Sequence, residues 1–333
     1  MIELNQVSKR FGERWAVDQL TLAVPAGEIY GLLGHNGAGK STAIGMMLGQ
    51  VWPTSGEVKV CGFEVGTHRS EALQKVGAIF ESPAFYDYLS GWRNLEILSS
   101  YTAPTSRSRL QEVINWVGLT DREHSKVRTY SHGMRARLAL AQALLPHPEL
   151  LILDEPSDGL DPEGIHEMRE TILRLHRELG LTILLSSHFL SEVEQLCTRI
   201  AVLNQGRKVF EGSLADTRRR ENWVRLTVPD FDRAWVCLQK AGLVTDRRNG
   251  KPNKLESVAK PHSVKAPESI PVELNGSATG LILLAQNIRT DQVVRELVRN
   301  EVALYEITRH EETLEDFYLS LMGQQRTGAG EGK

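Results

Sequence analysis

Short apolar runs alternate with amphipathic stretches along the first two thirds of the chain. In residues 2–7 and 14–24, apolar and polar side chains alternate, which predicts two strands that each bury one face. Residues 28–33, 149–154 and 181–187 are short runs rich in Leu and Ile, with turn residues on either side. Such runs are typical of central parallel strands, which are buried on both faces.

Helical spacing of apolar residues occupies much of the remaining sequence. It extends over residues 95–119 and 135–145, and a third amphipathic stretch, 164–180, lies between the last two apolar runs. The order strand, helix, strand predicts a βαβ unit. We therefore expect an α/β domain over residues 1–215.

The pattern changes beyond Gly212. Residues 220–320 again predict strands and helices in alternation, so we expect a small C-terminal α/β domain. A segment rich in Lys, Pro and Ser and without aromatic residues, 247–280, interrupts this domain and predicts a mobile insertion. Residues 323–333 predict a disordered tail.

Composition narrows the classes of function. The chain has 333 residues and a formal net charge of -3, so we expect no nucleic-acid partner. The three cysteines, Cys61, Cys197 and Cys237, lie far apart, which argues against a disulfide framework and against a zinc site. No run reaches the ~18 consecutive apolar residues of a spanning helix. We expect a soluble chain, so that any membrane-spanning part must come from another chain.

Residues 34–42 carry the first chemical motif, GHNGAGKST. Its spacing fits a phosphate-binding loop, because a predicted strand precedes it and a predicted helix follows. Glycines at 37 and 39 let backbone N–H groups surround phosphates, while Lys40 reaches the outer phosphate oxygens and Ser41 offers its hydroxyl to Mg²⁺. The alternative is a glycine-rich turn without a ligand. The candidate nucleotide-binding residues here are Asn36, Gly37, Gly39, Lys40, Ser41 and Thr42.

Two adjacent acids end the apolar run at 150–154. Asp154 stands at the end of the predicted buried strand, where its carboxylate can hold Mg²⁺. Glu155 follows directly and can polarise the water that attacks the γ-phosphate. A solvated turn is the alternative, but the pairing with a phosphate-binding loop favours an ATPase.

A second helix N-terminus also suits an anion. Ser131 can cap the helix that begins after it, and Gly133 leaves backbone N–H groups available at the positive end. This end cannot reach the phosphates at Lys40 from the same side. We therefore expect it to face the γ-phosphate held by a second copy, in a head-to-tail dimer that encloses two ATP molecules.

Taken together, these motifs resemble the nucleotide-binding subunit of an ABC transporter. The resemblance covers about the first 215 residues and rests on residues 34–42 followed in order by SHGMR, LLILDEP, SDGLD and LLSSH. It implies a P-loop NTPase cassette, with a mixed sheet, a RecA-like core and a helical subdomain at about residues 85–147. The small C-terminal α/β domain is then an appendage to the cassette, and the implied activity is Mg²⁺-dependent ATP hydrolysis coupled to transport.

The resemblance also assigns roles to single residues. Phe11 matches the aromatic residue on which adenine stacks, with Val17 beside it. Asp161 matches the acid that crosses the dimer interface, and His188 matches the histidine that contacts the γ-phosphate. The alternatives are that Phe11 is an ordinary turn aromatic and that His188 is a core histidine at a strand end.

Two positions depart from the family pattern: His132 stands where the family most often has Gly, and the other bears on the metal site. The family usually has a Gln after the strand VGAIF, whereas this chain has Glu81. A carboxylate there can still bind Mg²⁺, so Glu81 joins Ser41 and Asp154 as a candidate metal ligand. The Glu followed by SPAFY resembles the subgroup that exports bacitracin or confers immunity to lantibiotics. This similarity favours export of a drug or peptide antibiotic.

The partners follow from the same resemblance. Aromatic residues gather at 85–92, in a region where the family receives a helix of the membrane subunit; local packing of these rings is the alternative. We expect integral membrane permease subunits, a homodimer or paired cassette, and a place at the cytoplasmic face of the cell membrane. Two other functions stay open: an ATP-binding regulator with little turnover, and a soluble ABC ATPase that is not linked to transport.

Overall fold

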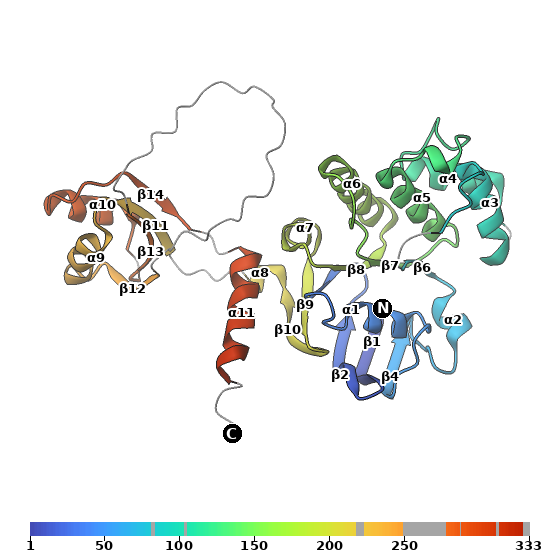
Figure 1. Cartoon of the computed structure of the whole chain (residues 1–333), viewed down its shortest axis with the longest axis horizontal. Coiled ribbons are helices and arrows are strands. Elements are labelled where there is room, and N and C mark those ends of the chain that lie inside the picture. The colour runs from blue at the N-terminus through green and yellow to red at the C-terminus, as the bar shows by residue number, and fades with distance from the viewer. Residues whose placement is uncertain are drawn as a thin grey trace. The chain divides into compact units, whose positions relative to one another are not determined.

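The computed structural model describes residues 1–80, 84–102, 105–217, 223–248, 278–286, 288–310 and 313–328. Two compact units share the chain (Figure 1). The first consists of Met1–Thr217 together with Leu314–Lys333, and the second is Arg218–Thr313. The first unit is therefore discontinuous in sequence.

A six-stranded sheet forms the centre of the first unit. Its strands, in spatial order, are β10 (Arg207–Ser213), β9 (Arg199–Asn204), β3 (Ile29–Leu33), β8 (Thr182–Ser187), β7 (Leu150–Asp154) and β6 (Val76–Ile79). All neighbours run parallel except β10, which pairs antiparallel with β9. Every residue of β3, β7 and β8 is buried, as expected for strands covered on both faces.

A second, antiparallel sheet has the spatial order β2, β1, β4, β5. These strands are β1 (Ile2–Phe11), β2 (Arg14–Val24), β4 (Ser55–Val60) and β5 (Phe63–Glu64). The apolar residues that alternate along β1 and β2 lie in a core shared with α1 (Lys40–Met47). Each strand thus buries one face, which is why its sequence alternates.

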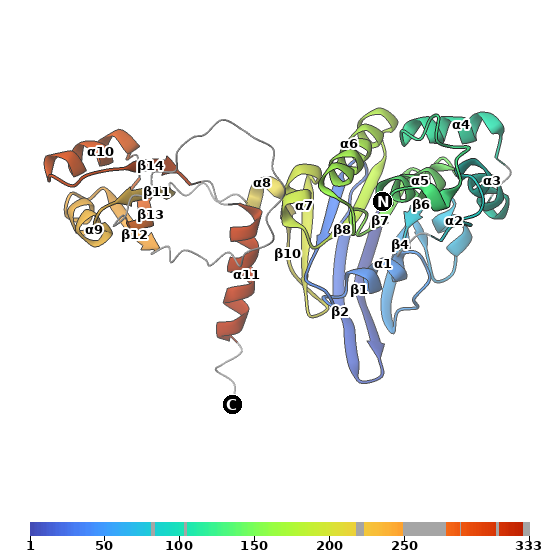
Figure 2. The same cartoon turned by 45° about the horizontal axis from the view of Figure 1, so that its top comes forward.

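Helices cover the six-stranded sheet and form a separate group at one end of the first unit. The separate group comprises α3 (Gly91–Thr102), α4 (Arg107–Trp116), the 3-10 turn η1 (Val127–Thr129) and α5 (His132–Leu144). Figure 2 shows α3, α4 and α5 gathered there, apart from β1, β2 and β4. Other helices of the first unit are α2 (Arg69–Leu73), α6 (Pro162–Leu179), α7 (Leu190–Leu196) and α8 (Leu214–Thr217). The first unit thus has the mixed sheet and the separate helical group that the sequence predicts.

The second unit is a four-stranded antiparallel sheet with a β-α-β-β-α-β order. Its strands and helices are β11 (Trp223–Val228), α9 (Phe231–Lys240), β12 (Val244–Arg248), β13 (Ala278–Leu284), α10 (Thr290–Arg299) and β14 (Glu306–Arg309). Both ends of the expected insertion at 247–280 therefore belong to strands: Arg247 and Arg248 of β12 pair with β13, and residues 278–280 of β13 pair with β11. The rest of it, residues 249–277, lies outside the described residues.

The last helix, α11 (Leu314–Gly328), corrects the expected end of the appendage at residue 320. Leu314 and Phe317 are buried in the core of the first unit, and Tyr318 and Leu321 pack against that core. The ring centroids of Phe210 and Phe317 are 4.7 Å apart in an edge-on arrangement. Along the sequence, the apolar residues 314, 317, 318 and 321 are three or four positions apart or adjacent, so they lie on one face of α11. The rest of the first unit covers this face.

The helix also changes the expectation for the C-terminal tail. The prediction placed disorder over residues 323–333, but the backbone of α11 stays helical to Gly328. Residues 329–333 lie outside the described part of the chain. Among the residues that the structure describes, no helix is both long enough and apolar enough to cross a membrane.

Candidate functional site

The glycine loop between β3 and α1 provides the wall of the site. Gly39 caps α1 with φ 106°, a left-handed backbone conformation that favours glycine. A Cβ at this position would lie 2.5 Å from the carbonyl oxygen of Ala16. The first turn of α1 therefore begins without a side chain at Gly39, and its free N–H groups suit a phosphate.

Lys40 projects its ammonium group back over this loop. The side chain is only 5% exposed, and its Nζ donates a hydrogen bond to the carbonyl oxygen of Gly34 at 2.7 Å. The same Nζ lies 3.1 Å from Oε1 of Glu155. A buried cation is thus held between the loop and an acid from a different strand, where a phosphate oxygen can compete for it.

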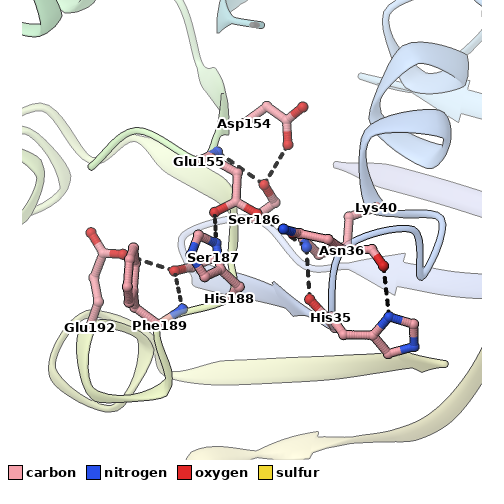
Figure 3. Close-up of polar contacts among 11 residues, drawn as sticks. His35, Asn36, Lys40, Asp154, Glu155, Ser186, Ser187, His188, Phe189 and Glu192 are labelled. Carbon is pink, nitrogen blue, oxygen red and sulfur yellow. Dashed lines mark hydrogen bonds and ion pairs between the residues drawn. The ribbon is translucent and has the colours of Figure 1, made fainter. Parts of the chain in front are cut away.

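Glu155 stands directly after β7 in an unusual backbone conformation. Its φ is 50°, a value that non-glycine residues rarely adopt, and its N–H donates to the Oγ of Ser186 at 3.0 Å. The second carboxylate oxygen, Oε2, lies 2.6 Å from Nδ1 of His188 (Figure 3). The acid therefore links Lys40 at the start of α1 to His188, which follows β8.

Asp154, the last residue of β7, is buried and accepts a hydrogen bond from the Ser186 hydroxyl. The two residues face each other because Asp154 pairs with Ser186 in the parallel register of β7 and β8. No group of three or more His, Cys, Asp and Glu side chains able to hold a metal occurs in the described part of the chain. A carboxylate and the Ser41 hydroxyl still fit Mg²⁺, which usually takes one or two protein oxygens together with substrate phosphates.

A cavity of about 580 Å³ joins the glycine loop, Glu155 and His188, whereas Asp154 and Ser186 do not line it. It is lined by Phe11, Arg14, Ala16, Asn36, Gly37, Ala38, Gly39, Lys40, Ser41, Thr42, Glu155, Asp158 and His188. The exposed ring of Phe11 thus lies at the same cavity as the glycine loop. Its size and its mixture of an aromatic ring, backbone N–H groups and a cation suit a nucleotide.

Val17 lies elsewhere than expected. It is fully buried in the core below the antiparallel sheet, and the cavity is lined by the preceding residue, Ala16. Side chains alternate between the two faces of a strand, so these neighbours on β2 point in opposite directions. The residue beside Phe11 at the cavity is therefore Ala16.

The N-termini of α5 and α6 lie next to each other, and His132 at the start of α5 lines a second cavity with Asp154, Glu155 and Asp158. Ser131 caps α5 by accepting a hydrogen bond from the N–H of Met134 at 3.2 Å. Asp161 caps α6 by accepting one from the N–H of Gly164 at 2.9 Å. A methyl group on Gly133 would lie 3.7 Å from Cα of Gly164. None of Ser131, Gly133 and Asp161 lines the nucleotide-sized cavity of its own chain.

The segment that follows β6 is described only in part, and Glu81 lies outside the described residues. Beyond it, Phe85 and Trp92 pack against the core, whereas Tyr86 is exposed and Tyr88 is 67% exposed. Local packing thus explains Phe85 and Trp92, whereas the rings of Tyr86 and Tyr88 are left for a partner to contact. Tyr86 and Tyr88 form the part available to a partner.

A smaller cavity of about 290 Å³ brings α11 close to the glycine loop. Tyr318 lines it together with His35, Asn36 and His188. Burial raises the pKa of Tyr318, and a hydrogen bond with the backbone of His35 lowers it by less. The sequence pattern predicts that Tyr318 belongs to the appendage, so its place beside the glycine loop was not predicted.

Ser186 was also missed, although the sequence carries a signal for it. It stands two residues before His188 in LLSSH. Parallel neighbouring strands end at the same edge of a sheet, so a polar residue near the end of β8 lies beside the acids that end β7. Arg14 and Asp158 also line the larger cavity, but no sequence motif marks them as part of the site.

Lys40→Ala tests the assignment of the cavity. We expect ATP to bind roughly 10- to 100-fold more weakly, because a charge-assisted contact to phosphate is lost. Titration calorimetry with ATP measures the affinity, and thermal unfolding checks that the variant folds. The matched control is Lys59→Ala on β4, which removes an exposed lysine outside the cavity. Equal ATP affinity in the wild type and Lys40→Ala would contradict the assignment.

Comparison with known proteins agrees with the resemblance to ABC transporter nucleotide-binding subunits. A family model described as ABC transporter matches residues 17–158. The bacitracin transport ATP-binding protein BcrA of Enterococcus faecalis is 35% identical over 97% of this chain and 96% of its own length. The linearmycin resistance ATP-binding protein LnrL of Bacillus subtilis (strain 168) is 36% identical over 74% of this chain and 81% of its own.

Solved structures resemble part of this chain. One, described as the ATP binding subunit of an ABC transporter, has a TM-score of 0.58 and 28% identity, over 66% of this chain and 92% of its own. Another, a dimeric bacterial ABC transporter cassette, has a TM-score of 0.58 and 25% identity over 64% of this chain and 99% of its own.

Proposed function

Because this chain belongs to the family of ABC transporter ATP-binding subunits, we propose that it hydrolyses ATP in the cavity lined by Lys40, Glu155 and His188. Hydrolysis powers the export of a drug, peptide antibiotic or similar substrate through separate membrane subunits. The contact of Glu155 with both Lys40 and His188 is the observation that carries this proposal.

The geometry supports a different role for each residue around the γ-phosphate. Lys40 binds phosphate oxygens, and the competing phosphate loosens its ion pair with Glu155. Glu155 then orients the attacking water and accepts its proton. His188, 2.6 Å from Oε2 of Glu155, holds this carboxylate in place and contacts the γ-phosphate. Phe11 stacks on the adenine at the mouth of the cavity.

Ser41 and Asp154 would hold Mg²⁺, with Glu81 as a further ligand. When bound, the ion neutralises charge on the phosphate oxygens during transfer. Ser186 fixes the carboxylate of Asp154 through its hydroxyl, so the orientation of this ligand is set by a neighbouring strand.

We propose that two copies form the working unit, head to tail. The N-termini of α5 and α6 do not line the cavity of their own chain, and a helix N-terminus with a serine cap suits an anion. In the dimer, Ser131 and Gly133 face the γ-phosphate of the partner, and Asp161 crosses the interface. A relative with the same fold has been solved as a dimer.

The membrane partner is a permease formed by a separate chain. By binding this permease, the present chain lies at the cytoplasmic face of the membrane. Exposed Tyr86 and Tyr88 offer the permease an aromatic surface beside the core. Export is supported by the names of the relatives, which concern bacitracin transport and linearmycin resistance.

Export is tested in a sensitive host that expresses the chain together with its permease. We expect the wild type to raise the inhibitory concentration of a peptide antibiotic such as bacitracin, and Lys40→Ala to give no protection. Lys59→Ala, the surface control, protects like the wild type. If the chain hydrolyses ATP but does not protect the host, the proposed substrate class is contradicted. If it binds ATP but does not hydrolyse it even together with the permease, a regulatory function is favoured.

A further inference from the structure

Glu192 in α7 carries a buried carboxylate for which the reaction described above has no use. The residue is 5% exposed, and burial of an acid is costly unless its oxygens are hydrogen-bonded. Oε2 accepts a hydrogen bond from the Ser187 hydroxyl at 2.9 Å, and Oε1 accepts one from the Ser157 hydroxyl. Each carboxylate oxygen is therefore held by a different serine.

These serines lie close in sequence to Glu155 and His188, where β7 and β8 end. Ser157 follows Glu155 by two residues after β7, and Ser187 directly precedes His188 at the end of β8. The Ser187 hydroxyl also accepts a hydrogen bond from the N–H of Phe189 at 3.0 Å. Figure 3 shows Glu192 on the far side of Ser187 and His188 from Lys40. The carboxylate thus ties the two loops together from behind the site.

We propose that Glu192 is a positioning residue for ATP hydrolysis, which sets the placement of Glu155 relative to His188. This inference rests on the proposed function. The two side chains lie 2.6 Å apart, and a displacement of ~1 Å in a catalytic group can cost ~10²-fold in rate. Their contact therefore depends on the relative position of the two loop backbones.

The backbone of Glu155 gives a second reason. Its left-handed conformation at φ 50° persists only when the surroundings determine it fully. Ser186 holds it from one side through the N–H of Glu155. Ser157 is held by Glu192 within the same turn after β7, so the strained residue has a fixed point on either side.

The test compares steady-state ATP hydrolysis of the full chain, with its permease, for the wild type, Glu192→Ala and Glu192→Gln. For Glu192→Ala we expect kcat to fall roughly 10- to 100-fold. KM for ATP changes little, because Glu192 does not line the cavity. Glu192→Gln keeps most of the activity, because its amide offers one acceptor and one donor to two hydroxyls that can each rotate.

Two further variants keep the outcome interpretable. Ser191→Ala changes an exposed residue of the same helix and leaves kcat unchanged. Ser187→Ala lowers kcat without removing the buried acid, so the proposal stays testable when Glu192→Ala does not fold. Thermal unfolding reports the structural contribution of each residue separately.

The possible results separate the inference from its premise. Wild-type turnover together with an unchanged kcat in Glu192→Ala overturns the positioning role alone. The same conclusion follows when Glu192→Gln loses as much activity as Glu192→Ala, or when KM changes in place of kcat. Absence of turnover in the wild type with its permease overturns the proposed function, and the positioning role falls with it.

Discussion

Glu155→Gln is expected to lower the steady-state rate of ATP hydrolysis by roughly 10²- to 10⁴-fold, the usual contribution of a general base. The amide has nearly the shape of the carboxylate but cannot accept the proton of the attacking water. It also cannot form an ion pair with Lys40, which lies 3.1 Å from Oε1. We therefore expect ATP binding to be preserved or strengthened while hydrolysis becomes much slower.

Phosphate release measures the rate, and titration calorimetry measures ATP affinity. Gel filtration in ATP then tests the dimer, because a variant that binds without hydrolysing should accumulate the closed form. Glu170→Gln, at an exposed position of α6, is the control and should behave like the wild type. A Glu155→Gln rate within tenfold of the wild-type rate would contradict the assignment of the base.

Features that depend on contiguous residues could be predicted from the sequence. The glycine loop is such a feature, because the left-handed conformation at Gly39 and the start of α1 at Lys40 are local. The buried strands β3, β7 and β8 were also predictable, since their apolar runs leave no polar face. Their parallel order followed from the helix between two of them.

Features that depend on distant residues were not predictable in the same way. Ala16 replaces Val17 at the cavity because the two faces of β2 are assigned by packing of the antiparallel sheet. The carboxylate of Glu192 meets Ser157 across 35 positions of sequence, and no local pattern marks that contact. In the same way, nothing near α11 in the sequence indicates that the cassette covers its apolar face.

Phe317→Ala is expected to lower the free energy of unfolding of the first unit by about 3 kcal/mol, at the lower end for a buried aromatic residue. The ring is 9% exposed and packs edge-on against Phe210 of β10. Its loss leaves a cavity between α11 and the cassette, which relaxes only partly. Calorimetric unfolding of the whole chain measures this change. The transition that moves to higher temperature in the presence of ATP is that of the first unit.

Leu319→Ala is the matched control on the same helix. Leu319 is 56% exposed, so its truncation should change the unfolding free energy by no more than about 0.5 kcal/mol. Equal, small effects of both variants would show that α11 contributes little to the stability of the cassette. A large effect of Leu319→Ala alone would place the covered face of the helix elsewhere.

The discontinuous first unit has a consequence during synthesis. Translation proceeds at about 5–20 residues per second, so the ribosome needs roughly 5–20 s to make the second unit after Thr217. Throughout that interval, the nascent cassette exposes the apolar surface around Phe210 that α11 later covers. Chaperone capture and aggregation compete for this surface on the ribosome. A stop codon in the second unit would leave it uncovered permanently, so truncated chains should be cleared by quality control even though every residue that lines the nucleotide-sized cavity has been made.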